Sequence, residues 1–462
     1  MTANANGFDP DLIRRYDVNG PRYTSYPTAN LFSEGFDAGD LRAALAAEPA
    51  AAGESRPLSL YVHVPFCAHV CYYCACNKII TNNRRHAVAY LERLHREIAL
   101  VAGLLPDAHR VEQLHFGGGT PTYLTDEQFV TLFDVLSRHF HLAPATEREF
   151  SIEIDPRTVD APRMGRLMDM GFNRVSLGIQ DFDPDVQQAV NRVQGVENTR
   201  AIIEAARQRG VKSVSVDLIY GLPLQTPESF ARTLATIVDL GPDRISLYSY
   251  AHLPQRFKTQ RQINVLDLPR ADTKLRLLEL AIDTLCASGY EYVGMDHFAR
   301  RDDSLVRAQR EGGLQRNFQG YTTHSHCDLV GLGVSAISTV GDVFAQNCKD
   351  LPGYYEKIDA GLLATERGLV SSAEDGLRRE VIAALMCDFR VDLAAVTARH
   401  GATPEHFAAE LDALRPMAED GLVNVDGAVI EVTPRGRFLI RNVAMTFDAY
   451  LAPATQGFSK AI

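Results

Sequence analysis

The stretch LSLYVHVPFCAHVCYYCACNKIITNN, residues 58–83, holds four of the chain's eight cysteines within ten positions. Its first seven residues, Leu58–Val64, are mostly apolar or β-branched and predict a buried strand. The cysteines follow at once, so the end of a strand presents a thiol-rich loop at one edge of a sheet. Cysteines this close in sequence are poor disulfide partners, and in a reducing compartment such a cluster more often binds metal.

Similar strand-like runs recur along the chain, and helix-period stretches such as 87–105 and 196–210 separate most of them. The runs are Leu58–Val64, Gln113–Phe116, Glu149–Ile154, Arg174–Ile179, Ser213–Ile219 and Arg244–Tyr250. Strands that alternate with helices at this spacing predict βαβ units and a mostly parallel sheet, so the fold class is α/β. Periodicity alone leaves open whether the sheet is flat or forms a full or partial (β/α) barrel.

The pattern changes near residue 351. Arg379–Phe389 and 408–421 predict helices, and 422–440 predicts two short strands around a turn, followed by a helix. Helices followed by a small hairpin resemble a winged-helix module; the alternative is a helical cap that packs on the main domain, which the acidic composition favours. We therefore expect an N-terminal arm at 1–50, a main α/β domain at 51–350 and a C-terminal helical domain at 351–462.

The charge balance narrows the classes of partner. Lys and Arg number 47 against 58 Asp and Glu, which gives a net charge of −11. Nucleic-acid binding depends on cationic patches against phosphate, so this surface argues against a nucleic-acid partner. The sequence shows no basic segment followed by an apolar stretch, which is the pattern of a signal peptide. No window reaches the ~18 consecutive apolar residues of a membrane-spanning helix. We therefore expect a cytoplasmic protein with no membrane span.

The cysteine spacing favours an iron–sulfur cluster over zinc. Cys67, Cys71 and Cys74 follow the pattern C-x3-C-x2-C, whereas a structural zinc site wants four ligands, usually as two separated pairs. Cys76 could be a fourth ligand, but it lies only two residues from Cys74. Three cysteines on a [4Fe–4S] cluster leave one iron open for a reaction. Zinc and accidental clustering remain alternatives. The other cysteines are expected to be small buried apolar residues: Cys286, Cys327, Cys348 and Cys387.

A glycine run follows the second predicted strand, in LHFGGGTPTYL at Leu114–Leu124. Three glycines let the backbone approach a ligand closely. The run is not a P-loop, because no Gly-Lys-Ser/Thr follows it. A tight βα turn is the alternative, and the neighbouring cysteine loop favours the ligand interpretation.

Polar residues also stand where predicted strands end, namely Glu153, Gln180 and Asp217. In (β/α) barrels and open α/β sheets, ligands bind at the carboxyl ends of the strands. Cys67 and Gly117–Gly119 follow strands as well, so all these candidates point to one rim of the sheet. Each of them alone is as well explained by a satisfied loop side chain.

C-x3-C-x2-C followed by GGGTP is typical of the radical S-adenosylmethionine (SAM) superfamily. The further motifs that match are NGPRYTSYPTA, CxxxCxxCxCNK, GGGTPTYL, SIEIDPR, GIQDF, DLIYGLPLQTPESF, SYAHLP, GMDHFAR, NFQGYTT and GVSAIS. Together they run nearly from end to end of the chain. The sequence therefore resembles the oxygen-independent coproporphyrinogen III oxidases.

This resemblance implies a partial (β/α) TIM-like barrel with the cluster at its rim and a smaller, mainly helical C-terminal domain. It implies the oxidative decarboxylation of two propionates of coproporphyrinogen III to vinyl groups, which yields protoporphyrinogen IX. The implied cofactors are one [4Fe–4S] cluster and two SAM molecules, and the implied oxidant is a 5′-deoxyadenosyl radical. A low-potential electron donor such as a flavodoxin or ferredoxin is expected, and a monomer is the default.

The resemblance also assigns residues by position. The cluster ligands correspond to Cys67, Cys71 and Cys74. Contacts of the cluster-bound SAM correspond to Tyr61, Gly118, Glu153 and Ile337. Contacts of the second SAM correspond to Tyr73, Gly119, Thr120, Gln180, Arg192, Asp217 and Ala251. Cys76 matches an extra cysteine that accompanies activity without being a ligand. Tyr73 stands where Phe also occurs, and the aromatic face is kept. We expect Cys76, Tyr61 and Arg22 to be the catalytic residues.

Substrate contacts are harder to read from the sequence. Four propionates call for Arg or Lys partners, and the candidates are Arg22, Arg300, Arg301, Arg307, Arg310 and Arg316. The alternative is that most of these arginines lie on a solvated, charged surface. We hypothesise that the PRYTSYPT segment of the arm closes over the site, with Arg22 or Tyr23 meeting the substrate.

Two other functions compete with the oxidase interpretation. A haem-binding chaperone of the same superfamily would keep the cysteine triad, but such relatives typically lack the extra cysteine and the arm. A zinc-binding structural or nucleic-acid module would predict zinc and a basic groove, which the net charge of −11 opposes.

Overall fold

The computed structural model describes residues 7–48, 56–106 and 109–451. Twelve strands form one sheet in the order β16-β15-β14-β13-β1-β4-β5-β6-β7-β8-β10-β9. Its parallel centre consists of β13 (Asp328–Leu332), β1 (Arg56–Val64), β4 (His109–Gly118), β5 (Glu149–Ile154), β6 (Arg174–Gln180), β7 (Ser213–Tyr220) and β8 (Arg244–Ser249). The six strands predicted from the sequence are thereby confirmed as β1 and β4–β8.

Antiparallel strands, which the sequence did not predict, extend both ends of this sheet. They are β14 (Ile337–Val340), β15 (Val343–Asn347) and β16 (Thr365–Val370) beyond β13, and β10 (His297–Arg300) and β9 (Tyr290–Gly294) beyond β8. Within the described ranges no pairing joins β16 to β9, so the curved sheet does not close. The expected partial barrel is confirmed.

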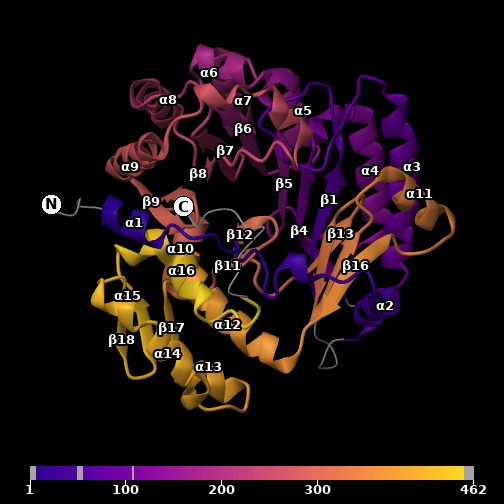
Figure 1. Cartoon of the computed structure of the whole chain (residues 1–462). Helices are drawn as coiled ribbons and strands as arrows, with labels where there is room; N and C mark the ends of the chain where they lie inside the picture. The colour runs from indigo at the N-terminus through magenta and orange to yellow at the C-terminus, as the bar shows by residue number, and fades with distance from the viewer. Residues whose placement is uncertain (1–6, 49–55, 107–108, 452–462) are drawn as a thin grey trace.

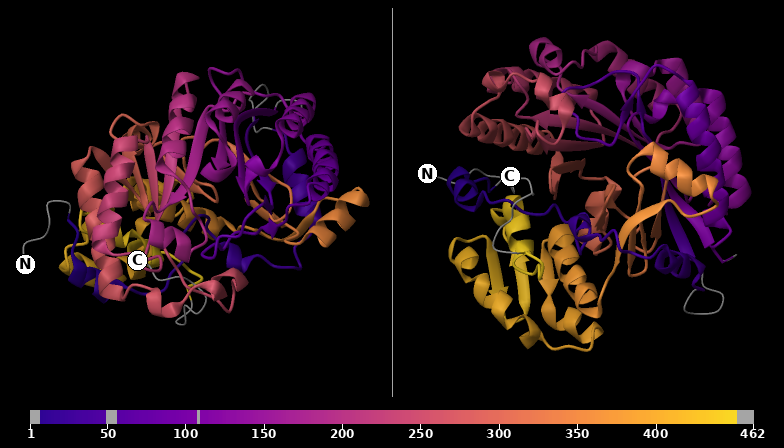
Figure 2. Two further views of the ribbon diagram at one scale, coloured as in Figure 1. Left: turned by 90° about the horizontal axis from the view of Figure 1, so that it is seen from above. Right: turned by 45° about the vertical axis from the view of Figure 1, so that its right-hand side comes forward.

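Helices cover the outer side of the curved sheet (Figures 1 and 2). They are α3 (Arg85–Ala102), α4 (Asp126–His139), α5 (Ala161–Asp169), α6 (Pro184–Ala189), α7 (Val196–Gln208), α8 (Pro227–Leu240) and α9 (Ala271–Ala287). Capping boxes start α4 at Thr125 and α8 at Thr226, where the threonine side chain accepts a bond from the third helical residue. No helix in the described part of the chain is long and apolar enough to cross a membrane.

The two faces of the parallel strands differ in chemistry. In β5, Phe150 and Ile152 pack into the main core, while Glu149, Ser151 and Glu153 alternate with them and line a cavity on the other face. Successive side chains of a strand point to opposite faces, so one face is apolar and the other polar. Polar side chains of β4, β6, β7 and β8 continue this pattern. The inside of the barrel is therefore a polar cavity rather than a packed core.

A smaller C-terminal domain packs below the barrel opening (Figure 2). It contains α12 (Ala373–Asp388), β17 (Arg390–Asp392), α13 (Leu393–Arg399), α14 (Ala408–Ala413), α15 (Arg415–Glu419), β18 (Val423–Asp426), β19 (Val429–Val432) and α16 (Ile440–Met445). The predicted hairpin is β18–β19, and β17 adds a third strand to it. Within the expected range 351–462, α11 (Leu351–Asp359) precedes β16 of the large sheet, so the element order favours a boundary after β16.

The N-terminal arm contains two helices, α1 (Pro10–Tyr16) and α2 (Ala38–Ala46), and joins both domains. Near its start, Phe8 packs edge-on against Phe438 of the C-terminal domain, with the ring centroids 5.6 Å apart. Further along, Ser33 pairs with Gly368 of β16 through reciprocal backbone hydrogen bonds of 2.9 and 3.1 Å. The arm thus runs from the C-terminal domain to one edge of the large sheet.

Candidate active site

The cysteine loop starts where β1 ends and is closed by two short parallel strands, β2 (Phe66–Cys67) and β3 (Ile79–Ile80). The N–H of Ile79 donates to the Pro65 carbonyl at 2.7 Å, and that of Thr81 donates to the Cys67 carbonyl at 3.0 Å. These bonds bring the two ends of the loop together and hold it at the carboxyl end of β1.

A cavity of about 1080 Å³ lies against this loop at the carboxyl ends of the parallel strands. The predicted residues that line it are Cys67, Cys71, Tyr73, Cys74, Cys76, Gly118, Gly119, Thr120, Glu153, Gln180, Arg192 and Asp217. Side chains from six separate loops and strand ends therefore face one space. Gln180 adopts a left-handed backbone with φ of 70°, a strained conformation for a residue that carries a side chain.

Tyr61 and Ile337 lie beside this cavity rather than in its lining. The Tyr61 ring stacks on His115, with centroids 5.8 Å apart, and His115 Nε2 lies 3.2 Å from the Glu153 carboxylate. Across the sheet, Tyr61 is in register with Gly331 of β13. A Cβ on Gly331 would come within 2.5 Å of the Ile337 carbonyl oxygen, so this glycine lets β14 approach closely.

Ala251 and Tyr73 are held together through Gln260. The side-chain amide of Gln260 donates to the carbonyls of Tyr73, at 3.0 Å, and Ala251, at 3.2 Å. This amide therefore ties the cysteine loop to the loop that follows β8.

Two arginines donate hydrogen bonds to the sulfur of Cys71. Arg157 Nη2 lies 3.2 Å and Arg192 Nη1 lies 3.4 Å from Cys71 Sγ. Both guanidiniums also pair with Asp155, at 2.7 and 3.2 Å. Burial alone would raise the pKa of Asp155, but the charges of Arg192 and Arg157 lower it. The Asp155 carboxylate thus holds two cations against one cysteine.

The other cysteines differ in surroundings. Burial raises the pKa of Cys67 to about 11, and its sulfur lies 3.3 Å from Thr120 Oγ1. A hydrogen bond with Cys76 lowers the pKa of Cys74, and Lys78 lowers it further. The same bond raises the pKa of Cys76, whose side chain is exposed. A thiolate at Cys74 is what a metal or cluster ligand requires.

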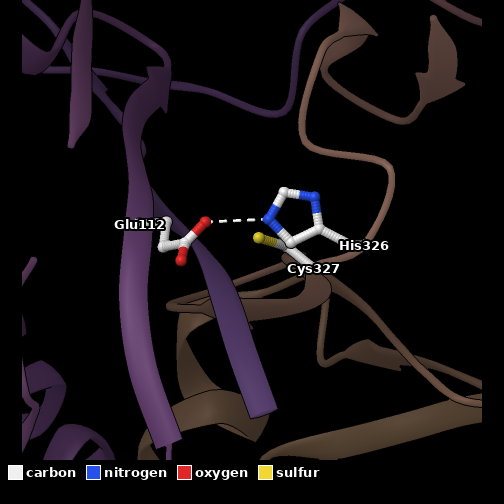
Figure 3. A group of neighbouring side chains, drawn as sticks. All are labelled: Glu112, His326 and Cys327. Atoms are coloured by element: carbon white, nitrogen blue, oxygen red, sulfur yellow. Dashed lines mark hydrogen bonds and ion pairs between the residues drawn. The ribbon is translucent and has the colours of Figure 1, made fainter. Parts of the chain in front are cut away.

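The spacing of these cysteines does not suit a single metal ion. Among the described residues, the only set of three potential ligands with all atoms within 4.8 Å of one another is Glu112, His326 and Cys327 (Figure 3). The thiols at the cavity are therefore more widely spread than ligands of one ion, which for zinc lie about 2.3 Å from the metal. The donor set fits a larger group such as a cluster.

The burial of the scattered cysteines corrects one expectation. Cys348 and Cys387 are buried, as expected, but Cys286 and Cys327 are only partly buried. Cys327 is next to an ion pair in which His326 Nε2 lies 2.8 Å from Glu112. It is partly exposed because it lies in the loop that leads into β13.

Two of the three acidic residues that line the cavity, Glu153 and Asp217, have opposite pKa shifts. The surrounding protein desolvates Glu153, but His115 and the Gly118 N–H, at 3.3 Å, lower the pKa of Glu153. Burial and the nearby charge of Glu153 raise the pKa of Asp217 to about 7. Glu153 is thus an anionic acceptor near neutral pH, and Asp217 is close to its titration midpoint.

Gly118 and Gly119 must be glycines because other residues approach their Cα atoms closely. A Cβ on Gly118, where φ is 112°, would lie 2.6 Å from the ring of His63. A Cβ on Gly119 would lie 2.8 Å from the Pro65 carbonyl group. His63 in turn accepts from the Tyr61 hydroxyl and donates to the Asn77 carbonyl, at 3.0 and 3.1 Å. The run lets β4 close over the start of the cysteine loop.

Of the six arginines considered for the substrate, five are exposed: Arg22, Arg300, Arg301, Arg307 and Arg310. Arg22 forms an ion pair with Asp296, and its guanidinium lies 5.9 Å from the ring centroid of Tyr248, which lines the cavity. Tyr23 is buried, and its hydroxyl donates to Asp448 at 2.9 Å. Arg316 is partly buried and lies in β11 (Gln315–Asn317).

The sequence analysis missed several residues of this site. Asp155 and Arg157 stand in the SIEIDPR motif, two and four residues after Glu153, and their position after a strand could have singled them out. His115 stands between the apolar Leu114 and Phe116 on β4, so the alternation of the strand could have marked it as part of the polar face. Gln260 has no local signal, because its partner Tyr73 is 187 residues away.

Comparison with known proteins gives consistent matches. The family model described as the radical SAM superfamily matches residues 61–237, and that of the HemN C-terminal domain matches 371–439. A Pseudomonas aeruginosa protein named oxygen-independent coproporphyrinogen III oxidase is 52% identical over 98% of this chain and 99% of its own length. A protein of the same name from Escherichia coli is 48% identical over the full length of both. The solved structure described as "Coproporphyrinogen III oxidase (HemN) from Escherichia coli is a Radical SAM enzyme" superposes with a TM-score of 0.91, at 48% identity, over 96% of this chain and 99% of that one.

Proposed function

Because this chain belongs to the family of oxygen-independent coproporphyrinogen III oxidases, which are radical SAM enzymes, we propose that it converts coproporphyrinogen III to protoporphyrinogen IX. The reaction turns two propionates into vinyl groups by oxidative decarboxylation. The observation that carries this proposal is the single cavity in which the cysteine loop, the glycine turn and the carboxyls of Glu153 and Asp217 face one another.

The cysteines would hold one [4Fe–4S] cluster through Cys67, Cys71 and Cys74, with one iron left for SAM. When bound, the cluster and SAM would supply for each propionate an electron and a 5′-deoxyadenosyl radical that takes one hydrogen atom from the β-carbon, after which CO₂ and one electron leave. The Arg157 and Arg192 guanidiniums donate to Cys71, and hydrogen bonds to a ligand sulfur are one means of tuning such a cluster.

The chain would bind and orient two SAM molecules in this cavity. Glu153 is an anionic acceptor suited to ribose hydroxyls, and the Gly118–Gly119 backbone leaves room for the methionine part. For the second molecule, Arg192 offers a buried cation and Asp217 a carboxyl. Both sets of residues line the one cavity, which supports adjacent sites for the two molecules.

Residues around the cavity would exclude water and complete the site. Tyr61 and His115 stack beside Glu153, and Gln260 fastens the cysteine loop to the loop after β8. Cys76 is exposed and faces the same cavity, in keeping with a role other than ligation. A low-potential donor such as a flavodoxin or ferredoxin would supply the electrons.

The test is an anaerobic turnover by protein with a reconstituted cluster, given SAM, a strong reductant and coproporphyrinogen III. We expect 5′-deoxyadenosine and, after oxidation, protoporphyrin, and we expect the Cys71→Ser variant to form neither. SAM cleavage without protoporphyrin, despite an intact cluster, would refute this substrate. Tight porphyrin binding with no product would instead support a haem chaperone, and protein that holds zinc and no iron would support a structural module.

A further inference from the structure

A second cavity of about 930 Å³, on the inner face of the barrel, adjoins the cavity at the cysteine loop. Both cavities are lined by Glu153, Ser176, Asp217 and Tyr248. The second cavity extends from these strand ends to β10 and β12 (Gly320–Thr322). A molecule held beside the cysteine loop would therefore lie next to this second cavity.

One wall of the second cavity is a row of three aromatic rings. Tyr248 and His297 meet edge to face with centroids 6.1 Å apart, and His297 and Tyr321 do so at 5.3 Å. A guanidinium lies at each end of the row. Arg22 lies 5.9 Å from the Tyr248 centroid, and Arg316 lies 5.0 Å from that of Tyr321. An apolar wall with a cation at each end suits a ligand with flat apolar rings and peripheral carboxylates.

Several charged side chains lie near this wall. Arg22 is paired with Asp296, and the buried Arg441 donates to the arm carbonyls of Gly20 and Pro21. Burial, then the charges of Arg22 and Arg316, lower the pKa of Arg441, while Asp296 opposes the shift. Three guanidiniums thus lie near this wall, with the carboxylates of Asp296 and, beside Tyr248, of Asp217.

His297 adds no further cation to this wall. Burial and the positive charge of Arg316 lower the pKa of His297 to about 4, and its Nδ1 lies 2.7 Å from the Met295 carbonyl. His297 is therefore neutral at physiological pH. Its shift also shows that the charge of Arg316 acts on the wall of the cavity.

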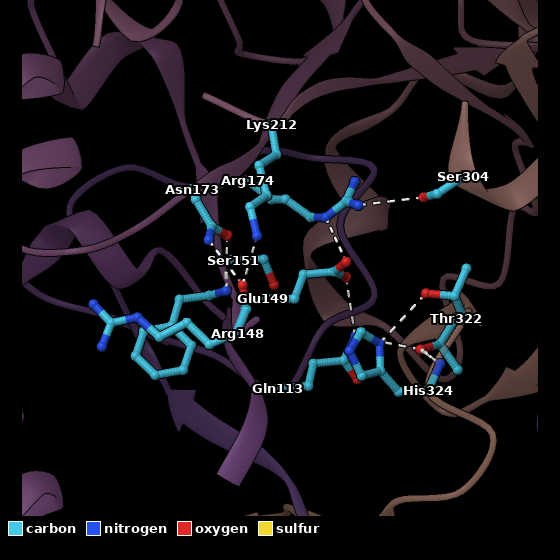
Figure 4. Close-up of polar contacts among 12 residues, drawn as sticks. Gln113, Arg148, Glu149, Ser151, Asn173, Arg174, Lys212, Ser304, Thr322 and His324 are labelled. Atoms are coloured by element: carbon cyan, nitrogen blue, oxygen red, sulfur yellow. Dashed lines mark hydrogen bonds and ion pairs between the residues drawn. The ribbon is translucent and has the colours of Figure 1, made fainter. Parts of the chain in front are cut away.

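The two arginines that line the second cavity are paired with carboxylates. Arg174 Nε lies 2.7 Å from Glu149 Oε2, as Figure 4 shows. Arg244 Nε lies 3.0 Å from both carboxylate oxygens of Asp303. These two side chains therefore have no need of an anionic ligand.

Arg316 differs from them in having no paired carboxylate in the described part of the chain. Its Nε and Nη1 atoms, like those of Arg174, are buried and have no hydrogen-bond partner among the described residues. Buried guanidinium nitrogens without an acceptor are costly, unless a ligand supplies the anion. Arg316 lines a third cavity of about 910 Å³, and the neighbouring Asn317 lines both this cavity and the second one.

We propose that Arg316 binds a carboxylate of the substrate, while the rings of Tyr248, His297 and Tyr321 contact its apolar part. This inference rests on the proposed function, since it names the group that would hold a propionate distant from the reacting carbon. Arg22, shared with Asp296, would contact a second carboxylate at the opposite end of the wall. Arg316 is thus a binding residue, and it selects for a substrate with carboxylates on its rim.

Binding of coproporphyrin III, the stable oxidised form with the same four propionates, tests this proposal on holoenzyme. Charge-assisted hydrogen bonds are roughly twice as strong as neutral ones, so we expect R316Q to raise the Kd about ten- to hundred-fold. R316K, which keeps the charge without the planar fork, should recover part of the affinity. The matched control is R310Q, because Arg310 is 57% exposed and paired with Glu291 at 2.7 Å; its Kd should equal that of the wild type.

Turnover separates this inference from the proposed function. Wild-type enzyme that makes no protoporphyrin refutes the function itself. Active wild-type enzyme, together with an R316Q protein of normal iron content that keeps the wild-type Kd and KM, refutes the role of Arg316 alone. If R316Q does not retain its cluster, the same comparison is made with R316K, for which an unchanged Kd and KM would equally overturn the proposal.

Discussion

Arg192 donates a hydrogen bond to the sulfur of Cys71 across 3.4 Å. Arg192 was expected at the second SAM molecule, and Cys71 was expected to be a ligand of the cluster. Their contact joins the two expected binding sites directly, and Asp155 fixes it by pairing with the same guanidinium nitrogen at 3.2 Å. A change at Arg192 should therefore affect the stability of the cysteine loop as well as ligand binding.

We predict that Arg192→Gln lowers the free energy of unfolding by about 2–4 kcal/mol, because it leaves the buried Asp155 carboxylate with Arg157 alone. Urea denaturation measures the change. Arg200→Gln is the matched control, since its pair with Asp239 is exposed and is worth about 0–1 kcal/mol. Equal losses for the two variants would contradict the importance of the buried pair.

Gly118→Ala should disrupt the site, because its Cβ would lie 2.6 Å from the His63 ring and φ is 112°. Steric overlap and backbone strain together predict a loss of about 2–5 kcal/mol and a reduced iron content after reconstitution. Gly210→Ala also has a positive φ, 73°, but meets nothing within 4 Å, so it should cost about 1–2 kcal/mol and leave the iron content unchanged. Normal iron content in Gly118→Ala would argue against the close-approach explanation.

Cys74→Ser should lose the cluster, whereas Cys76→Ser should keep it and lose activity. Cys74 is the thiol whose pKa is lowered, and Cys76 is the exposed partner of its hydrogen bond. Iron and sulfide per chain after anaerobic reconstitution measure the difference. Cys286→Ser, on α9 and outside the cavity, is the control. Equal metal loss from Cys74→Ser and Cys76→Ser would instead favour a zinc site with four cysteine ligands.

Glu97 on α3 gives a prediction for stability against pH. Burial raises the pKa of Glu97 from its usual 4.5 to about 7, although Tyr354, Gly333 and Asn347 donate hydrogen bonds to it. The folded protein therefore binds this proton more tightly than the unfolded chain does. Its contribution to stability is fully present below about pH 4.5 and is lost as the pH rises through about 7, by about 3 kcal/mol in total.

The melting temperature from pH 5 to pH 8 measures this effect. Glu97→Gln cannot titrate at this position. Its melting temperature should therefore rise relative to that of the wild type as the pH increases from 5 to 8. A constant difference from pH 5 to pH 8 would show that Glu97 is ionised throughout.

The central strands and the rim could be predicted from the sequence, because both leave a local pattern. In β5 the alternation of Phe150 and Ile152 with Ser151 and Glu153 marks a strand and also its polar face. The cysteine spacing and the glycine run are local as well. The family resemblance then supplied the residue assignments that no pattern gives.

The remaining features depend on contacts between distant segments. β14 is only four residues long and pairs antiparallel, so it has too few positions to show a period. Gln260 acts through Tyr73, 187 residues away, and Arg316 is distinguished only by the partners that it lacks in three dimensions. Such features follow from the packing of the whole chain and not from any stretch of it.

The pairing of Ser33 with Gly368 has a consequence for association between copies of the chain. β16 is an outermost strand, and an uncovered strand of this kind offers free N–H and C=O groups to a second molecule. Ser33 occupies two of those groups, and the Phe36 ring packs so close to Gly368 that an added Cβ would lie 2.7 Å from it. The arm thus caps this end of the sheet against self-association, in addition to any part it has at the substrate.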